Sequence, residues 1–387
     1  MSDVLTCRRD EFQLARDYHY FNCAYMGPLP RASEEAGFEA IRKKRMPTAI
    51  VPPDAFWETD RLRELFAKLV GVSEPGRVAI QPGVSYGVAT AARNLPVSAG
   101  QNLVLTQEQF PGNVYSWRRI AAESGAELRM VGPGGGEERG RTWNERLLEA
   151  IDVKTALVAV PNVHWTDGTW FDLVAIGRRC REVGAALVVD ATQSVGALPF
   201  DASAVRPDVL ICAAYKWLLG PYSFSFAYFS ERFDHGVPLE ETWIARERSH
   251  DFQRLVDYQD AYLPGAVRYD VAERSNFFLA PIAKASLELL LEWRPERIQA
   301  YCRELTAGLL AEVRRLGYSV EAEEWRAHHL FGLRMPTSVD LAKLRDDLAS
   351  RNVSASLRGS ALRLSANVYN DETDIGVLAE VLRAAVR

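Results

Sequence analysis

Two apolar segments that each end near a polar residue constrain the fold of this chain more than any other feature. Residues 186–189 read Ala-Leu-Val-Val before Asp190, and residues 209–212 read Val-Leu-Ile-Cys shortly before Lys216. Continuous apolar runs of this length are typical of strands buried on both faces of a parallel sheet. Ligands of open α/β sheets bind beyond the carboxyl ends of the strands, so we expect Asp190 and Lys216 to share a ligand site.

The residues around this pair indicate the nature of the ligand. Lys216 is followed by an apolar run that begins at Trp217, and apolar surroundings favour the neutral amine, which is the nucleophile that forms Schiff bases. A carboxylate one strand away is the usual partner of a protonated pyridine nitrogen. With Gln193 in the turn after Asp190, the set predicts pyridoxal 5'-phosphate as cofactor. The alternative is that Asp190 caps a turn and Lys216 lies on the surface beside a tryptophan.

The ordered set resembles the class V aminotransferase family of fold-type I pyridoxal-phosphate enzymes, which includes cysteine desulfurases, kynureninases and isopenicillin N epimerase-like proteins. The residues that carry the resemblance are Asp190, Gln193, Tyr215, Lys216, Gly220 and Pro221. The resemblance implies an α/β fold, with a large domain built on a mostly parallel sheet and a smaller α+β C-terminal domain. It also implies catalytic roles for Asp190 and Lys216 and cofactor contacts from Gln193 and Tyr215.

Further positions match cofactor-binding residues of the family. Val84 and Ser85, at the start of a helical pattern, match the pair that contacts the cofactor phosphate, and helix N-termini bind anions. Phe110 matches the residue that stacks on the pyridine ring, and Asn162 matches the asparagine that hydrogen-bonds the ring hydroxyl. Residues 83–87 also fit the Gly-x-Ser-x-Gly motif of serine hydrolases, an alternative that leaves the strand-end pair unexplained.

The substrate contacts implied by the resemblance come from both ends of the chain. Arg363, in an apolar strand, matches the arginine that binds the substrate carboxylate through two hydrogen bonds. Asn22 and Tyr25 belong to an aromatic segment that enters the substrate pocket in the family. His164 is a candidate general base, with a packed core histidine as the alternative. The pocket loops, near Tyr25, His164, Trp165 and Arg358, share no chemical bias, so the substrate side chain is not predicted.

Two positions imply a shared active site. Trp243 and Asn276 match residues that, in kynureninase-like members, reach the phosphate bound by the neighbouring subunit. The resemblance therefore implies a homodimer in which each site draws on both chains. For Trp243 an ordinary core or interface aromatic remains the alternative.

Composition excludes several other classes of protein. With 387 residues and a net charge of −5, the chain lacks the basic balance expected of a nucleic-acid-binding protein. No run of apolar residues approaches the length of a membrane span, and five widely spaced cysteines predict reduced thiols in a cytoplasmic protein without a metal site.

We expect the chain to divide into three parts. These are an N-terminal segment over 1–25 that packs on the small domain, a large cofactor-binding domain over 26–270 and a small domain over 271–387. Within the large domain, residues 31–71 show a helical pattern.

The resemblance leaves several reactions open, all on a small α-amino acid substrate. Residues 351–361 contain no cysteine, whereas desulfurases carry a nucleophilic cysteine shortly before the carboxylate-binding arginine, so we do not expect a cysteine desulfurase. The Phe110-Pro111 and Tyr215-Lys216 pairs favour a β-lyase that cleaves the substrate side chain, as kynureninase-like and C–S lyase enzymes do. Transamination and epimerisation are the alternatives. A cofactor-binding regulatory protein is a further alternative, but no residues remain for a DNA-binding module.

Overall fold

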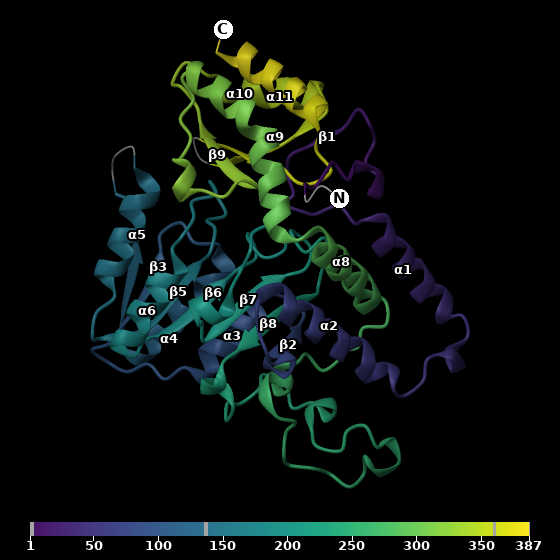
Figure 1. Ribbon diagram of the computed structural model, residues 1–387. Helices are drawn as coiled ribbons and strands as arrows, with labels where there is room; N and C mark the ends of the chain where they lie inside the picture. The colour runs from purple at the N-terminus through teal and green to yellow at the C-terminus, as the bar shows by residue number, and fades with distance from the viewer. Residues whose placement is uncertain (1–3, 135–137, 359–360, 387) are drawn as a thin grey trace.

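A central seven-stranded sheet organises the computed structural model, which describes residues 4–134, 138–358 and 361–386 (Figure 1). The strands lie in the order β2-β8-β7-β6-β5-β3-β4. Their bounds are β2 Val78–Gln81, β3 Asn102–Thr106, β4 Glu127–Val131, β5 Thr155–Pro161, β6 Ala186–Asp190, β7 Val209–Ala213 and β8 Ser225–Phe229. Neighbours from β4 to β7 are parallel, whereas β8 is antiparallel to both β7 and β2. The predicted mostly parallel sheet is confirmed.

Helices cover both faces of this sheet, which is why its strands are apolar at successive positions. On one face α3 (Val84–Asn94) and α4 (Tyr115–Ser124) pack on residues such as Leu105, Val188 and Ile211. On the other, α2 (Asp54–Val70), α5 (Arg139–Ala150) and α6 (Leu173–Val183) pack on alternate residues such as Val189 and Leu210. The short helix α7 (Ala202–Val205) lies between β6 and β7 along the chain.

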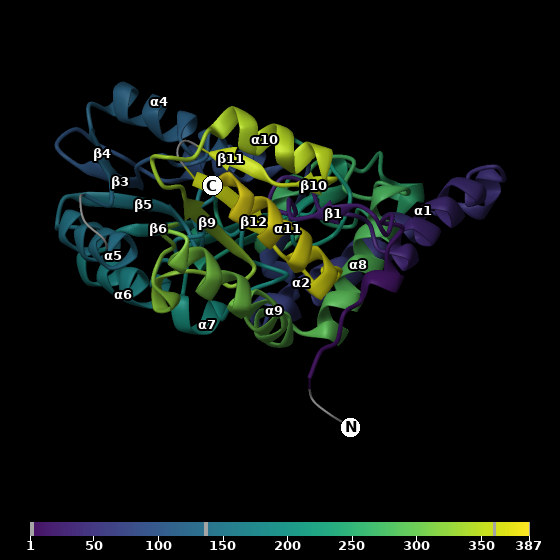
Figure 2. The same cartoon turned by 90° about the horizontal axis from the view of Figure 1, so that it is seen from above.

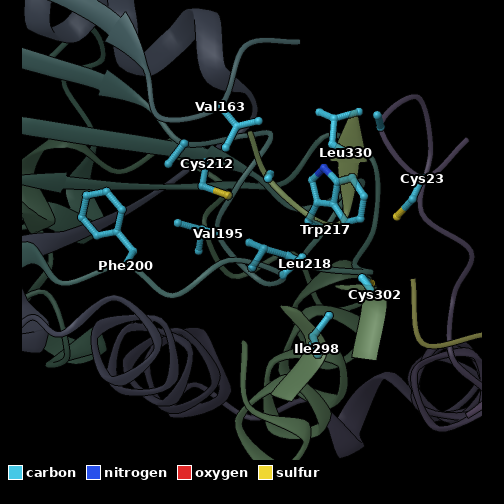
Figure 3. Packing of buried hydrophobic residues seen from close by; sticks show 14 of the residues in the cluster. Cys23, Val163, Val195, Phe200, Cys212, Trp217, Leu218, Ile298, Cys302 and Leu330 are labelled. Carbon is cyan, nitrogen blue, oxygen red and sulfur yellow. The ribbon is translucent and has the colours of Figure 1, made fainter. Parts of the chain in front are cut away.

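The buried apolar cluster on the α2, α5 and α6 face of the sheet also extends into the C-terminal part of the chain. Trp217 and Leu218, just after β7, belong to one buried cluster with Cys212 of the sheet and Ile298 of α9 (Pro295–Arg315), and Figure 3 shows Leu218 between the last two. Both residues are about 1% exposed. The turn that carries Lys216 is therefore held by apolar packing on the side away from the sheet edge.

The C-terminal part is a small α+β unit. Its three antiparallel strands lie in the order β11 (Ser356–Arg358), β12 (Ala361–Ser365) and β9 (Leu330–Arg334). They are accompanied by α9, α10 (Leu341–Ser350) and α11 (Glu372–Ala385), as Figure 2 shows from above. The N-terminal strand β1 (His19–Tyr20) pairs in parallel with β10 (Val353–Ser354), so the start of the chain packs on this unit.

One helix links the two parts. Helix α8 (Leu279–Trp293) packs against α2 and against α1 (Arg31–Lys43). The Ser286 hydroxyl on α8 donates to the carbonyl of Leu219, at 2.8 Å, in the turn after Lys216. The expected boundary between residues 270 and 271 stays a prediction. Among the described helices, none is long and apolar enough to span a lipid bilayer.

Candidate active site

A cavity of about 260 Å³ lies beyond the carboxyl ends of the central strands. Its wall takes residues that follow β2, β3, β5, β6 and β7, because parallel strands bring their carboxyl ends to one edge of the sheet. Seven of the predicted site residues line it: Val84, Ser85, Phe110, Asp190, Gln193, Tyr215 and Lys216. The topology therefore brings together residues that are more than 130 positions apart in the sequence.

Lys216 stands in the turn between β7 and β8 and is 7% exposed. Burial lowers the pKa of its amine to about 8, while the charge of Asp190 opposes this shift and that of Arg363 adds to it. The amine nitrogen lies 5.3 Å from the centre of the Phe110 ring and 5.6 Å from that of Tyr215. A substantial neutral fraction near neutral pH makes this amine a nucleophile and a base.

Asp190 ends β6 and faces the same cavity. Its carboxylate accepts a hydrogen bond from the backbone N–H of Thr192 at 3.0 Å. Burial raises the pKa of Asp190, and the hydrogen bonds from Thr192 together with the charge of Lys216 oppose this rise. The Thr192 hydroxyl in turn accepts from the N–H of Ala213 at 3.3 Å, which ties the end of β6 to the end of β7.

Gln193 lines the cavity, but its side chain is engaged with protein groups. The amide nitrogen donates to the carbonyl of Ala24 at 3.0 Å, and the amide oxygen accepts from the indole N–H of Trp217 at 2.8 Å. The backbone carbonyl of Gln193 bonds the Nε2 of His329 at 2.8 Å. The amide nitrogen carries a second hydrogen, which leaves one donor for a ligand.

The N-terminus of α3 forms one end of the cavity. Val84 and Ser85 are its first helical residues, and among the residues that the structure describes no side chain caps the first turn. Gly83 precedes them, and a Cβ at this position would have no atom within 4 Å. Backbone N–H groups and the positive end of the helix therefore face open space, an arrangement that suits a phosphate group.

Phe110 and Trp165 form an aromatic wall. Phe110 is 40% exposed, and its ring lies edge-on to Trp165 with 5.6 Å between ring centres. Asn162, which follows β5, is 5% exposed and does not line the cavity; its N–H bonds the carbonyl of Asp190 at 3.4 Å. Asn162 thus lies next to the site, although its hydrogen bond to a ring hydroxyl stays a prediction.

His164 is sequestered. It is fully buried, its Nδ1 bonds the Thr166 hydroxyl at 2.7 Å, and its Nε2 bonds the carbonyl of Gln107 at 3.3 Å. Burial lowers its pKa. Both ring nitrogens are engaged away from the cavity, so we interpret His164 as a packed neutral histidine, the alternative considered for it above.

The predicted substrate residues lie beside the cavity rather than in its wall. Arg363 on β12 is 2% exposed; its Nη1 donates to the carbonyl of Trp165 at 2.8 Å and its Nη2 lies 3.5 Å from the Oδ1 of Asn22. Burial lowers the pKa of Arg363 to about 10, with a contribution from the nearby Arg358. Tyr25 is 60% exposed and is outside the cavity wall.

Trp243 and Asn276 lie apart from the cavity of their own chain. Trp243 is 45% exposed and packs edge-on against Phe56 and Phe252. The Oδ1 of Asn276 accepts from the backbone N–H groups of Phe278 and Leu279 at the start of α8. Within one chain, neither residue contributes to the site.

Sequence reasoning missed some residues of the wall. Thr192 lies between two chosen residues, and its hydroxyl was a signal that the run Asp-Ala-Thr-Gln offered. Gln109 and Tyr222 also line the cavity. The amide nitrogen of Gln109 is buried without a hydrogen-bond partner among the described residues, and Tyr222 packs on Tyr215 with 4.6 Å between ring centres. Nothing in the local sequence distinguished these two.

This donor set suits a phosphorylated pyridine aldehyde. A helix N-terminus is available for its phosphate, an aromatic ring for its ring face, a buried carboxylate for its pyridine nitrogen and a lysine amine for its aldehyde. The buried carboxylate of Asp190 and the partnerless amide of Gln109 are polar groups that such a ligand would satisfy.

Comparison with known proteins gives matches over nearly the whole chain. The family model for class V aminotransferases matches residues 54–242. The uncharacterized aminotransferase YcbU of Bacillus subtilis is 26% identical over 324 residues, which are 83% of this chain and 82% of that protein. Isopenicillin N epimerase of Streptomyces clavuligerus is 25% identical over 375 residues, 92% of each chain.

Solved structures establish the fold. A mutant of C-DES with glycine covalently linked to its PLP cofactor has a TM-score of 0.82 at 19% identity and covers 97% of this chain and 99% of that one. Cysteine desulfurases also occur among the matched relatives and structures. The comparisons therefore span aminotransferase, epimerase, lyase and desulfurase names and do not select one reaction.

Proposed function

This chain belongs to the class V aminotransferase family of pyridoxal-phosphate enzymes, and from that membership we propose an enzyme that deprotonates an α-amino acid at Cα and then cleaves a bond in its side chain. The observation that carries the proposal is the buried amine of Lys216, whose pKa is lowered to about 8, in one cavity wall with Asp190 and an uncapped helix N-terminus. Such an amine both holds the cofactor and accepts a proton.

The residues that would hold the cofactor are the predicted ones. Lys216 would link to its aldehyde carbon, the first turn of α3 at Val84 and Ser85 would bind its phosphate, and Phe110 would stack on its ring. Asn162 would hydrogen-bond the ring hydroxyl, Gln193 would donate the remaining hydrogen of its amide nitrogen to the cofactor, and Tyr215 would bind the phosphate. When bound, pyridoxal phosphate withdraws electrons from the Cα of an attached amino acid.

The chain's own groups then direct the proton. Arg363 binds the α-carboxylate and so orients the Cα–H bond toward the amine of Lys216. Once released from the cofactor, the neutral amine of Lys216 accepts the Cα proton. The buried carboxylate of Asp190 would hold a proton on the pyridine nitrogen of a bound cofactor, because a negative charge favours the protonated form of a neighbouring base. The rings of Phe110 and Trp165, which lie edge-on with 5.6 Å between their centres, would cover one side of the bound cofactor.

The cysteine that lies close to Lys216, Cys23, is unsuited to form a persulfide. Cys23 lies close, with its Sγ 3.7 Å from the carbonyl of Lys216, but it is fully buried and burial raises its pKa to about 12. The thiol therefore stays protonated near neutral pH and is a poor nucleophile. Amino-group transfer is the second candidate, favoured by the match to an aminotransferase over 83% of the chain.

The proposal is tested by following the visible absorption of the purified holoenzyme while single amino acids and cysteine conjugates are added, with pyruvate, alanine and ammonia assayed alongside. A side-chain-cleaving enzyme recovers its absorption unaided while a side-chain product accumulates. Lasting loss of the absorption that only a keto acid reverses indicates an aminotransferase. Purified protein that cannot take up the cofactor, or a Lys216→Ala variant with normal turnover, contradicts the proposal.

We further propose a homodimer with a shared site. Trp243 lies in a segment with exposed apolar side chains, including Phe252, Val256 and Tyr258, which a second subunit would cover. Mixing inactive Lys216→Ala and Trp243→Ala proteins should restore activity, because one site of the mixed dimer contains both intact residues. Sedimentation as a monomer at micromolar concentration, or no restoration, contradicts the proposal.

A further inference from the structure

Two arginines lie on the same face of the small sheet. In the antiparallel pair β11–β12, Ser356 lies opposite Arg363 and Arg358 lies opposite Ala361. Residues two apart on a strand point to the same side, so Arg358 and Arg363 are diagonal neighbours on one face. Such neighbours are roughly 7–8 Å apart at the backbone, within reach of each other's long side chains.

Both guanidinium groups contact Trp165, a residue of the cavity wall, although neither arginine lines the cavity itself. Arg363 donates to the carbonyl of Trp165, and the guanidinium carbon of Arg358 lies 5.6 Å from the centre of the Trp165 ring. Trp165 lines the cavity next to Phe110. Arg358 is half-buried, and its Nη1 donates to the carbonyl of Leu357 at 2.9 Å. The two positive charges therefore lie next to the same residue of the cavity wall.

No acidic side chain balances them. Within the described residues, neither Arg358 nor Arg363 has a carboxylate within 4.0 Å, and the Nε of each is buried without a hydrogen-bond partner. Arg63 and Arg274 differ in this respect, because both lie within 4.0 Å of the Asp270 carboxylate. Two adjacent, partly desolvated positive charges repel each other, and a bound anion relieves this.

We propose that Arg358 binds a second anionic group, at the end of the side chain of the amino acid whose α-carboxylate Arg363 binds. This inference rests on the proposed function and narrows its substrate to dianionic amino acids. Aspartate and glutamate are the simplest probes of the class, and asparagine and glutamine are their neutral counterparts of nearly equal shape. Arg358 is then a specificity residue and takes no part in the proton transfer.

The first test titrates the visible absorption of the holoenzyme with these four amino acids. We expect the acidic pair to bind roughly 10- to 100-fold more tightly than the amides, the range for hydrogen bonds to a charged group. Arg358→Gln should reduce this preference to less than about threefold and leave amide binding unchanged. Arg351→Gln makes the same charge change at an exposed arginine that pairs with Glu380, and should keep the preference.

The second test does not depend on the proposed function. Succinate should bind the apoprotein more tightly than butyrate by calorimetry, and Arg358→Gln should remove the difference. Equal binding of acids and amides to the holoenzyme, equal binding of succinate and butyrate, or a preference that survives in Arg358→Gln, overturns the inference alone. A holoenzyme that responds to no amino acid contradicts the proposed function, and the succinate experiment still decides the role of Arg358.

Discussion

Gly27 lies directly against the backbone of Lys216: its N–H donates to the carbonyl of Tyr215 at 2.8 Å, and a Cβ at Gly27 would lie 2.1 Å from the carbonyl oxygen of Lys216. A segment from the start of the chain thus supports the lysine turn from behind. Any side chain at Gly27 must displace one of the two backbones.

We therefore expect Gly27→Ala to lower cofactor affinity by at least about tenfold and the free energy of unfolding by roughly 1–3 kcal/mol. Both are measured on purified protein, by cofactor titration and by urea denaturation. Gly308→Ala is the control, because a Cβ on that helical glycine meets nothing within 4 Å and should stabilise the protein by up to about 1 kcal/mol. Unchanged cofactor binding in Gly27→Ala would contradict the supporting role.

Lys216 should react with added cofactor in a pH-dependent way. Its pKa of about 8 is below the usual 10.5 because burial disfavours the charged amine, so the neutral form becomes dominant above pH 8. The rate of cofactor uptake by apoprotein should rise about tenfold per pH unit below 8 and level off above it. Stopped-flow absorbance measures this, with Lys216→Ala as the blank. A rate that still rises tenfold between pH 9 and 10 would refute the lowered pKa.

Replacing Asp190 should lower the activity without lowering the thermal stability of the apoprotein. Its pKa is raised by burial, so the charged carboxylate is costly in the apoprotein, and Asp190→Asn removes that cost while keeping the shape. We expect an apoprotein melting temperature equal to or above that of the wild type. Turnover should fall by roughly 100-fold or more, because the pyridine nitrogen loses its proton. A marked loss of thermal stability would show that Asp190 has a mainly structural role.

Acid should destabilise the apoprotein partly through His329. Burial lowers its pKa from 6.5 to about 4, so between these pH values the unfolded chain binds a proton that the folded protein does not. From pH 7 to pH 5 the free energy of unfolding should fall by on the order of 2 kcal/mol from this residue. His329→Asn should flatten that slope in urea titrations, whereas His235→Asn, at an exposed position, should leave it unchanged. Equal slopes in all three proteins would exclude the effect.

The sheet and the position of the cavity could be predicted because short apolar stretches of the sequence indicate them. Apolar runs ending at Asp190 and shortly before Lys216 determine where each strand ends, and parallel pairing then brings those ends together. The roles of individual residues were less accessible. The side chain of Gln193, for example, bonds Ala24 and Trp217, and no spacing rule relates positions 169 residues apart.

Two other differences have physical causes. The helical pattern over 31–71 is interrupted: α1 ends at Lys43 and α2 starts at Asp54, because Pro47, Pro52 and Pro53 lack the N–H groups a continuous helix needs. Arg358 was expected only near a pocket loop, and its proposed role comes from lying diagonally to Arg363 across two strands. That diagonal depends on the register of the β11–β12 pair, which follows from the pairing of the two strands and not from either strand alone.

The contact between β1 and the C-terminal unit has a consequence for the order of assembly. His19 bonds Asp374 at 2.6 Å, across 355 positions, and the same segment continues to Ala24 and Gly27 behind the lysine turn. Contacts of such sequence separation form late, since the intervening chain must first be brought together. The central sheet can therefore be built while its lysine is still unsupported. We therefore expect that almost the entire chain must be synthesised before the cavity reaches its final shape.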